Sequence, residues 1–248
     1  MLTLVGIGLW NEQDLTLGGL EACKSADEVY AEFYTNIWNG DVKKIEKLIG
    51  KKIKILERSD LEENASGLIT RSKKSDIALL VCGDPLVFTT HSSLVAEAKK
   101  QRIKTRIIHN ASILSAIGET GLHAYKFGKS ATIPMPDKIS NADSVYNAIK
   151  ENKTLGLHTL LLLDVDLEKK KHLKVSEAFK ILSEMEKKRG EGFAAAHVEA
   201  IVFSSAGSQS PVIEYGKISA LSKKKFSEPA VIIIPGMLHF SEAEFLGA

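Results

Sequence analysis

One apolar run in the first half of the chain constrains the fold more than any other feature. Residues 77–82 read Ile-Ala-Leu-Leu-Val-Cys, with no polar residue at alternate positions. A half-exposed strand alternates apolar and polar side chains, whereas a central strand of a parallel sheet is covered on both faces. The run therefore predicts a central parallel strand, and the turn residues Gly83-Asp84-Pro85 mark its end.

Short β-rich runs alternate with amphipathic helical stretches around this strand. Strands are predicted at residues 2–6, 28–33, 53–56, 77–82 and 105–109, and helices at 15–25, 41–49, 60–72 and 90–101. Asp60 is predicted to cap the third helix, because Glu63 follows at the capping-box spacing. Strands that alternate with helices are typical of βαβ units and a largely parallel sheet.

The pattern changes after residue 109. A helix is predicted at 112–119, a polar stretch with two prolines lies at 132–143, and helices at 144–151 and 175–189 flank a strand at 158–165. Strands at 200–204, 212–215 and 231–234 make the end more β-rich. We therefore expect two α/β domains, residues 1–112 and 113–248, the second with a mixed sheet.

Composition excludes several classes of protein. The net charge is only +2 over 248 residues, which is too mild to indicate nucleic-acid binding. Cys23 and Cys82 form no CxxC pair, so a disulfide framework and a cysteine-rich zinc site are excluded. No apolar run approaches the roughly 18 residues of a membrane span, and the first residues lack the features of a signal peptide. We expect a cytoplasmic protein with no membrane or nucleic-acid partner.

Lysines gather in two short clusters, residues 169–171 and 223–225. Such clusters are usually solvated loops or helix ends, and the alternative is a docking patch for an acidic partner. Both interpretations stay open at this point.

Ligands of open α/β sheets bind beyond the carboxyl ends of the strands, so the residues at the strand ends are the candidates for a binding site. Gly6-Ile7-Gly8-Leu9 lacks the third glycine of a dinucleotide fingerprint, because Asn11 stands at that position. Gly128-Lys129-Ser130 lacks the first glycine of a P-loop, where His123 stands. The Gly6–Gly8 turn is either a tight connection or a place where the backbone approaches a small ligand.

Two further strand ends carry polar residues. Asp84 either forms hydrogen bonds within its own turn or binds a ligand. Ser112 either caps the next helix or binds a ligand. No HExxH or GxSxG motif is present, and His91, His109 and His158 are interpreted as structural histidines. No local pair of a nucleophile and a base appears.

Taken together and in this order, the motifs resemble the diphthine synthases, methyltransferases of diphthamide biosynthesis within the wider tetrapyrrole methylases. The resemblance spans the whole chain, and its two most specific motifs are HNASI at 109–113 and YKFG at 125–128. The other matching stretches include VGIGL at 5–9, DLTL at 14–17, Glu32, GDP at 83–85, TTH at 89–91, GLHTL at 156–160, Pro235-Gly236 and Leu238-His239. The compact length suits an archaeal-type enzyme.

The resemblance implies two α/β domains of the tetrapyrrole methylase type, with S-adenosyl-L-methionine in the cleft between them. It implies successive methylation of the amino group of 3-amino-3-carboxypropyl-histidine on translation elongation factor 2, with S-adenosyl-L-homocysteine as the product of each transfer. It also implies a homodimer. The family's cofactor contacts fall on Leu9, Asp84, Val87, Ser112, Ile113, Leu163, Ala206 and Val231.

This sequence departs from the family pattern at two places. Val231 stands where the family often has His, and Leu86-Val87-Phe88 follows GDP where smaller residues are common. With Val at position 231, a contact from the backbone of this residue to the cofactor is still possible, whereas a contact from a His side chain is not. The larger residues 86–88 narrow the expected pocket. Two alternatives remain: a tetrapyrrole-precursor methylase on the same fold, which HNASI and YKFG disfavour, and a non-catalytic nucleotide-binding module.

Methyl transfer from a sulfonium needs no covalent nucleophile, which agrees with the absence of a nucleophile motif. The enzyme aligns the amine, the methyl group and the sulfur in a water-poor site. The sequence assigns no metal and no catalytic residue, and it does not identify the base that takes the proton of the amine.

Overall fold

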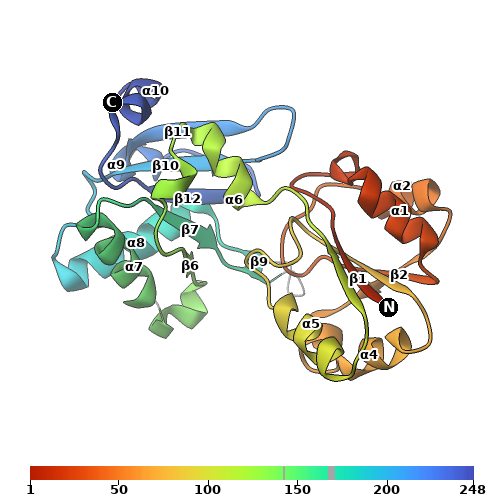
Figure 1. Cartoon of the computed structure of the whole chain (residues 1–248). Helices are drawn as coiled ribbons and strands as arrows, with labels where there is room; N and C mark the ends of the chain where they lie inside the picture. The colour runs from red at the N-terminus through yellow and green to blue at the C-terminus, as the bar shows by residue number, and fades with distance from the viewer. Residues whose placement is uncertain (142, 167–170) are drawn as a thin grey trace. The chain divides into compact units, whose positions relative to one another are not determined.

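The computed structural model describes residues 1–141, 143–166 and 171–248 of the chain. It divides into two compact units, Met1–Leu114 and Ser115–Ala248. The ribbon in Figure 1 shows one sheet with flanking helices in each unit. Among the described residues, no helix is long and apolar enough to cross a membrane.

Unit 1 is built on a five-stranded parallel sheet in the order β3-β2-β4-β1-β5. The strands are β1 (Leu2–Gly6), β2 (Glu28–Glu32), β3 (Ile53–Leu56), β4 (Ile77–Val81) and β5 (Thr105–Ile108). The apolar run that predicts a central strand is β4, which lies in the middle of the sheet. Each of the five predicted strands is present, with its carboxyl end at the same edge.

The two faces of this sheet have separate cores. In β4, Ile77, Leu79 and Val81 belong to one apolar cluster, and Ala78 and Leu80 belong to the other. Helices α1 (Leu17–Ser25) and α2 (Val42–Ile49) cover the second face, while α3 (Arg58–Glu62), α4 (Ser66–Ser72) and α5 (His91–Lys100) cover the first. Burial on both faces is the reason why this strand has no polar alternation.

The helix predicted at 60–72 is wrong in two respects. It is two short helices, α3 and α4, and Asp60 is not the N-cap of the first. Glu57 holds the N-cap position, and Asp60 lies three residues later, where its carboxylate accepts the backbone N–H of Glu57 at 2.9 Å. Asp60 thus has the reciprocal role in a capping box that begins one turn earlier.

Unit 2 contains a mixed five-stranded sheet in the order β11-β10-β12-β7-β6. The strands are β6 (Ala131–Ile133), β7 (Thr159–Leu163), β10 (Glu199–Ser204), β11 (Val212–Lys217) and β12 (Ala230–Ile234). Only β6 and β7 pair in parallel, and the other neighbours are antiparallel. The expected mixed sheet is therefore present, and β6 overlaps the start of the stretch 132–143, for which the sequence predicted no strand.

Helices α7 (Asp143–Thr154) and α8 (Val175–Arg189) pack on one face of this sheet through Tyr146, Ile149, Phe179 and Leu182. The helix predicted at 112–119 is α6 (Ile113–Ala116), followed by the 3₁₀ turn η2 (Ile117–Thr120). Three further 3₁₀ turns are η1 (Glu12–Asp14), η3 (Ala124–Lys126) and η4 (Pro136–Asn141). The small elements β8 (Val165–Asp166), β9 (Lys171–His172), α9 (Ile218–Leu221) and α10 (Phe240–Leu246) complete the unit.

The lysine cluster 169–171 lies mostly outside the described residues, which include only Lys171 of the three. Residues 223–225 follow α9 and are all exposed, and Lys224 forms an ion pair with Glu214. The second cluster is therefore solvated. Exposure is compatible both with a docking patch and with an ordinary solvated surface.

Candidate functional site

The loops after β1 and β4 are joined at the carboxyl edge of the unit 1 sheet. Gly8 N–H donates to Gly83 O at 3.2 Å, and Gly83 N–H donates to Gly8 O at 2.9 Å. Both glycines have positive φ, +79° and +67°, which other residues rarely adopt. The bridge brings together two of the strand ends that the sequence singles out.

Atoms of the protein itself fill the space around Gly6 and Gly8. A β-carbon on Gly6 would lie 2.6 Å from Gly83 O and 2.7 Å from Asn110 Cβ, and one on Gly8 would lie 2.3 Å from Asp14 Cβ. These approaches require glycine without any ligand. A tight connection after β1 is therefore enough to explain both glycines of the Gly6–Gly8 turn.

Asn110, after β5, ties the third loop to the first. Its side-chain amide donates to Gly6 O and to Asp14 O, each at 2.9 Å. Asp14 in turn accepts the backbone N–H of Trp10 at 2.6 Å through its carboxylate. The asparagine of HNASI is thus a structural bridge, which explains why an amide with two donors is needed there.

Asp84 links the second loop to the third. Its Oδ1 accepts Leu86 N–H at 3.0 Å, and its Oδ2 lies 2.8 Å from His109 Nδ1 and accepts Asn110 N–H at 3.2 Å. The side chain of Asp84 is only 7% exposed, whereas that of His109 is 70% exposed. Asp84 therefore forms a hydrogen bond within its own turn, which was one of the two possibilities. It also bonds the loop after β5.

The remaining candidate residues of unit 1 lie around this edge. Leu9, Val87 and Ile113 are half-buried, and Ser112 is buried. Leu86 and Phe88, which flank Val87, are exposed, and Phe88 has a φ of +56°. The edge thus presents aliphatic side chains beside loops that are fixed by internal hydrogen bonds, a surface suited to a small ligand with a flat apolar part.

The three candidates of unit 2 also share one edge of their sheet. Leu163 ends β7, Ala206 follows β10, and Val231 is the second residue of β12, which runs antiparallel to both strands. Ala206 and Val231 are 7% and 8% exposed, so both residues are buried. The structure places these three residues at one edge of the unit 2 sheet, and it places the five residues of unit 1 at the carboxyl edge of their own sheet.

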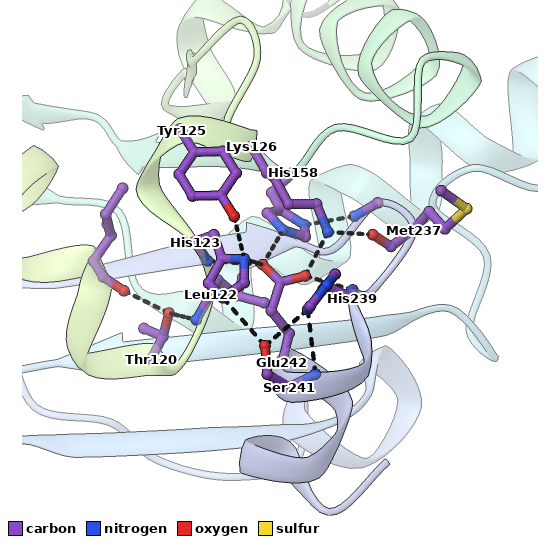
Figure 2. Close-up of polar contacts among 12 residues, drawn as sticks. Thr120, Leu122, His123, Tyr125, Lys126, His158, Met237, His239, Ser241 and Glu242 are labelled. Carbon is purple, nitrogen blue, oxygen red and sulfur yellow. Dashed lines mark hydrogen bonds and ion pairs between the residues drawn. The ribbon is translucent and has the colours of Figure 1, made fainter.

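Unit 2 also contains a polar cluster that sequence reasoning missed, centred on Glu242 of α10 (Figure 2). The carboxylate is fully buried and has four donors: the backbone N–H groups of His123 and His239, each at 2.7 Å, Lys126 Nζ at 2.5 Å and His158 Nε2 at 3.0 Å. Burial raises the pKa of Glu242, but the donors outweigh it and hold the pKa at about 2.

The cluster fixes the tautomer of His158. Its Nδ1 accepts the N–H of Gly236 at 3.0 Å, so Nε2 carries the proton that is donated to Glu242. Burial lowers the pKa of His158, which keeps the ring neutral. His158 is therefore a structural histidine, as predicted, and the motifs YKFG, GLHTL and Pro235-Gly236 meet in one structural network.

One sequence signal for this network was available. His239 and Glu242 stand at the spacing of a capping box, and the structure shows that Glu242 accepts His239 N–H at the start of α10. Among the described residues, no group of His, Cys, Asp and Glu side chains is arranged to hold a metal ion.

Comparison with known proteins gives a consistent result. The family of tetrapyrrole (corrin/porphyrin) methylases matches residues 1–221. The diphthine synthase of Methanocaldococcus jannaschii is 46% identical over 99% of this chain and 97% of that protein. The diphthine synthase of Methanosarcina mazei is 45% identical over 99% of this chain and 94% of that protein. A crystal structure of diphthine synthase matches with a TM-score of 0.90 at 40% identity, over 99% of this chain and 94% of that one.

Proposed function

Since this chain belongs to the tetrapyrrole methylase family, and within it to the diphthine synthases, we propose that it is an S-adenosyl-L-methionine-dependent methyltransferase of diphthamide biosynthesis. Its substrate is the amino group of 3-amino-3-carboxypropyl-histidine on elongation factor 2, which it methylates successively. The observation that carries the proposal is identity above 40% over nearly the full length of both chains.

The residues at the two sheet edges fit the cofactor. Leu9, Val87 and Ile113 offer aliphatic surface for an adenine ring, and the loops around them are held by hydrogen bonds within unit 1. We assign cofactor contacts to these three residues, to Asp84 and Ser112, and to Leu163, Ala206 and Val231 of unit 2. Because the side chain of Val231 is mostly buried, its contact is made by the backbone.

When bound, S-adenosyl-L-methionine supplies a methyl group on a positively charged sulfur that departs as a neutral thioether. The part of the protein is to align the amine with that methyl group and to exclude water. Asp84 acts on this alignment indirectly, because it fixes the loops after β4 and β5 to each other. We assign it a positioning role and no proton transfer.

The same proposal includes the state of the enzyme. It works as a cytoplasmic homodimer, and its macromolecular partner is elongation factor 2. Light scattering at micromolar concentration tests the dimer: twice the chain mass supports it, and the mass of one chain contradicts it.

The test of the activity is incubation with labelled S-adenosyl-L-methionine and elongation factor 2 that carries the 3-amino-3-carboxypropyl group. The mass of the modified peptide should rise by successive methyl increments. Binding of the cofactor without transfer to any acceptor would instead indicate a nucleotide-binding module. Transfer to a tetrapyrrole precursor but not to the peptide would indicate the alternative methylase.

A further inference from the structure

An exposed imidazole at the carboxyl edge of the unit 1 sheet has no part in the function described so far. His109 is the first residue after β5, and 70% of its side chain is exposed. Its Nδ1 lies 2.8 Å from Oδ2 of Asp84, whose side chain is only 7% exposed. A buried carboxylate is thus bonded to an imidazole that is open to solvent and to ligands.

The hydrogen bonds of Asp84 determine which nitrogen of His109 carries the proton. Its Oδ1 accepts the N–H of Leu86 at 3.0 Å, and its Oδ2 accepts the N–H of Asn110 at 3.2 Å. An ionised carboxylate only accepts hydrogen bonds, so Nδ1 of His109 is the donor in the bond between the two side chains. In the neutral ring the lone pair is then on Nε2, which is the atom left to take a proton.

His109 lies among residues that we assign to the cofactor. Asp84, to which it is bonded, is one of them, and residues 112–113 follow it in the same loop. Asn110 ties this loop to the loop after β1 through two hydrogen bonds of 2.9 Å. The imidazole is therefore held on a fixed loop, and its hydrogen bond to Asp84 orients the ring.

The other titratable side chains in the loops after β1, β4 and β5 are engaged or buried. Glu12 is paired with a lysine at 2.6 Å, and Asp14 closes the turn after β1 by accepting a backbone N–H, also at 2.6 Å. Cys82 is 5% exposed, and burial raises the pKa of its thiol well above the usual value. Asp84 is buried and accepts three hydrogen bonds. His109 is therefore the exposed base of these three loops.

His158 shows the contrasting arrangement of a structural histidine. It is fully buried, and both of its ring nitrogens form hydrogen bonds within unit 2. His109 exposes most of its side chain and bonds a carboxylate through Nδ1. A carboxylate that orients an imidazole and leaves Nε2 to the reactant is the arrangement of a general base.

We propose that His109 takes the proton of the amino group that is methylated, and that Asp84 orients its ring for this step. The inference rests on the proposed function. An alkyl amine is mostly protonated near neutral pH, and in that form it has no lone pair with which to attack a methyl group. A base beside the cofactor is therefore required before each transfer.

The step balances without a further reactant. One proton moves from the ammonium nitrogen to Nε2 of His109, and the neutral amine keeps the electron pair. That pair forms the bond from nitrogen to the methyl carbon, while the bond from carbon to sulfur breaks and its electrons stay on sulfur. His109 then gives the proton to water and is ready for the next transfer, and Asp84 stays ionised throughout.

Single-turnover methyl transfer to elongation factor 2 that carries the 3-amino-3-carboxypropyl group tests this between pH 6 and pH 9, at saturating S-adenosyl-L-methionine. His109→Asn keeps an amide donor near the position of Nδ1 and removes the basic nitrogen. The control is His197→Asn, at an exposed histidine of unit 2. His109→Asn should transfer the methyl group about 100- to 1000-fold more slowly at pH 7, and added imidazole should restore part of the rate. Calorimetry should give the same affinity for S-adenosyl-L-methionine in both variants and the wild type, which also shows that His109→Asn is folded.

Equal rates for His109→Asn and His197→Asn over the whole pH range would overturn the proposal. A second measurement is independent of activity: ¹⁵N NMR of the histidine rings, with His109→Asn used to assign the signals. A neutral ring protonated on Nδ1 supports the proposal, and one protonated on Nε2 overturns it, because that nitrogen then has no lone pair for the proton. Absence of transfer by the wild type contradicts the proposed function itself, whereas a loss confined to His109→Asn identifies the base.

Discussion

Glu32 and Glu242, one in each unit, are both fully buried, yet their pKa values move in opposite directions. Glu242 has Lys126, the His158 ring and two backbone N–H groups around it, and its pKa is about 2. Glu32 accepts hydrogen bonds from Thr35 and from the backbone N–H of Tyr34, faces the uncharged ring of His91, and has a pKa of about 7. For Glu242 the charged and backbone donors outweigh the effect of burial on the pKa, whereas for Glu32 burial outweighs the donors.

The comparison also separates two uses of a buried acid. Glu242 joins three segments that are far apart in the sequence, around residues 123–126, 158 and 239, and so holds α10 in place. Glu32 ends β2 at the carboxyl edge of the unit 1 sheet, and its pKa of about 7 places it close to its midpoint at neutral pH.

The largest expected effect is the loss of charge at Glu242. Glu242→Gln should destabilise unit 2 by about 3 kcal/mol, because the amide brings two donors of its own among four donors and leaves Lys126 without its counter-charge. Hydrogen exchange of the amides in α10 and β12 measures this. The control is the exposed Glu244→Gln, for which protection should not change. Equal protection in the two variants would show that the cluster is not stabilising.

The next effect is a pH-dependent gain of stability in Glu32→Gln. The folded-state pKa of Glu32, about 7, lies above its usual 4.5, so its contribution to stability is fully present below pH 4.5 and is lost as pH rises to 7. Relative to wild type, Glu32→Gln should gain up to roughly 3 kcal/mol between pH 4.5 and pH 8.

Both tryptophans, Trp10 and Trp38, lie in unit 1, so urea unfolding followed by their fluorescence reports on this unit alone. Glu97→Gln serves as the control. A stability difference between Glu32→Gln and wild type that does not vary with pH would show that Glu32 titrates normally. For Glu242 the sign is reversed: its contribution is present above pH 4.5 and is lost as pH falls toward 2.

A third buried carboxylate, that of Asp84, bonds the loops after β4 and β5 and lies beside the exposed ring of His109. Asp84→Ala should weaken the binding of S-adenosyl-L-methionine by about tenfold, which corresponds to one or two lost hydrogen bonds, and should leave the fold intact. Calorimetry measures the affinity, with the exposed Glu63→Ala as the control. Unchanged affinity would remove Asp84 from the site.

The smallest effect is expected at the surface. Charge reversal of Lys223 and Lys225 to Glu should raise the KM for elongation factor 2 severalfold at low salt and leave the affinity for S-adenosyl-L-methionine unchanged. Exposed charges act mainly on association, and salt screens them over about 8 Å at physiological ionic strength. Steady-state kinetics at two salt concentrations decide the point. If KM equals that of wild type at low salt, the cluster is only solvated.

The sequence predicts the strands of unit 1 well, because their periodicity and buried runs are local signals, as in β4. It also predicts that Asp84 and the 109–113 stretch meet, since the carboxyl ends of parallel strands converge. It misses β6, which has three residues, and it merges α3 with α4, whose break at residues 63–65 has no Gly or Pro to mark it.

The two buried glutamates show a deeper limit. Glu242 bonds a segment 119 residues away, and no local pattern gives that contact. For Glu32, the sequence places the residue at a strand end but shows neither how deeply it is buried nor which donors surround it, and these two factors together set the pKa. The identity of a side chain can be read from sequence, whereas its charge state follows from tertiary neighbours.

The most direct measurement of the contrast is carbon NMR of the glutamate side chains between pH 4 and pH 8, with Glu32→Gln and Glu242→Gln used to assign the two carboxyl signals. We expect the Glu32 signal to titrate with a midpoint near 7, and the Glu242 signal to stay that of a carboxylate throughout. A Glu32 midpoint near 4.5, or a Glu242 signal that titrates together with it, would contradict the account.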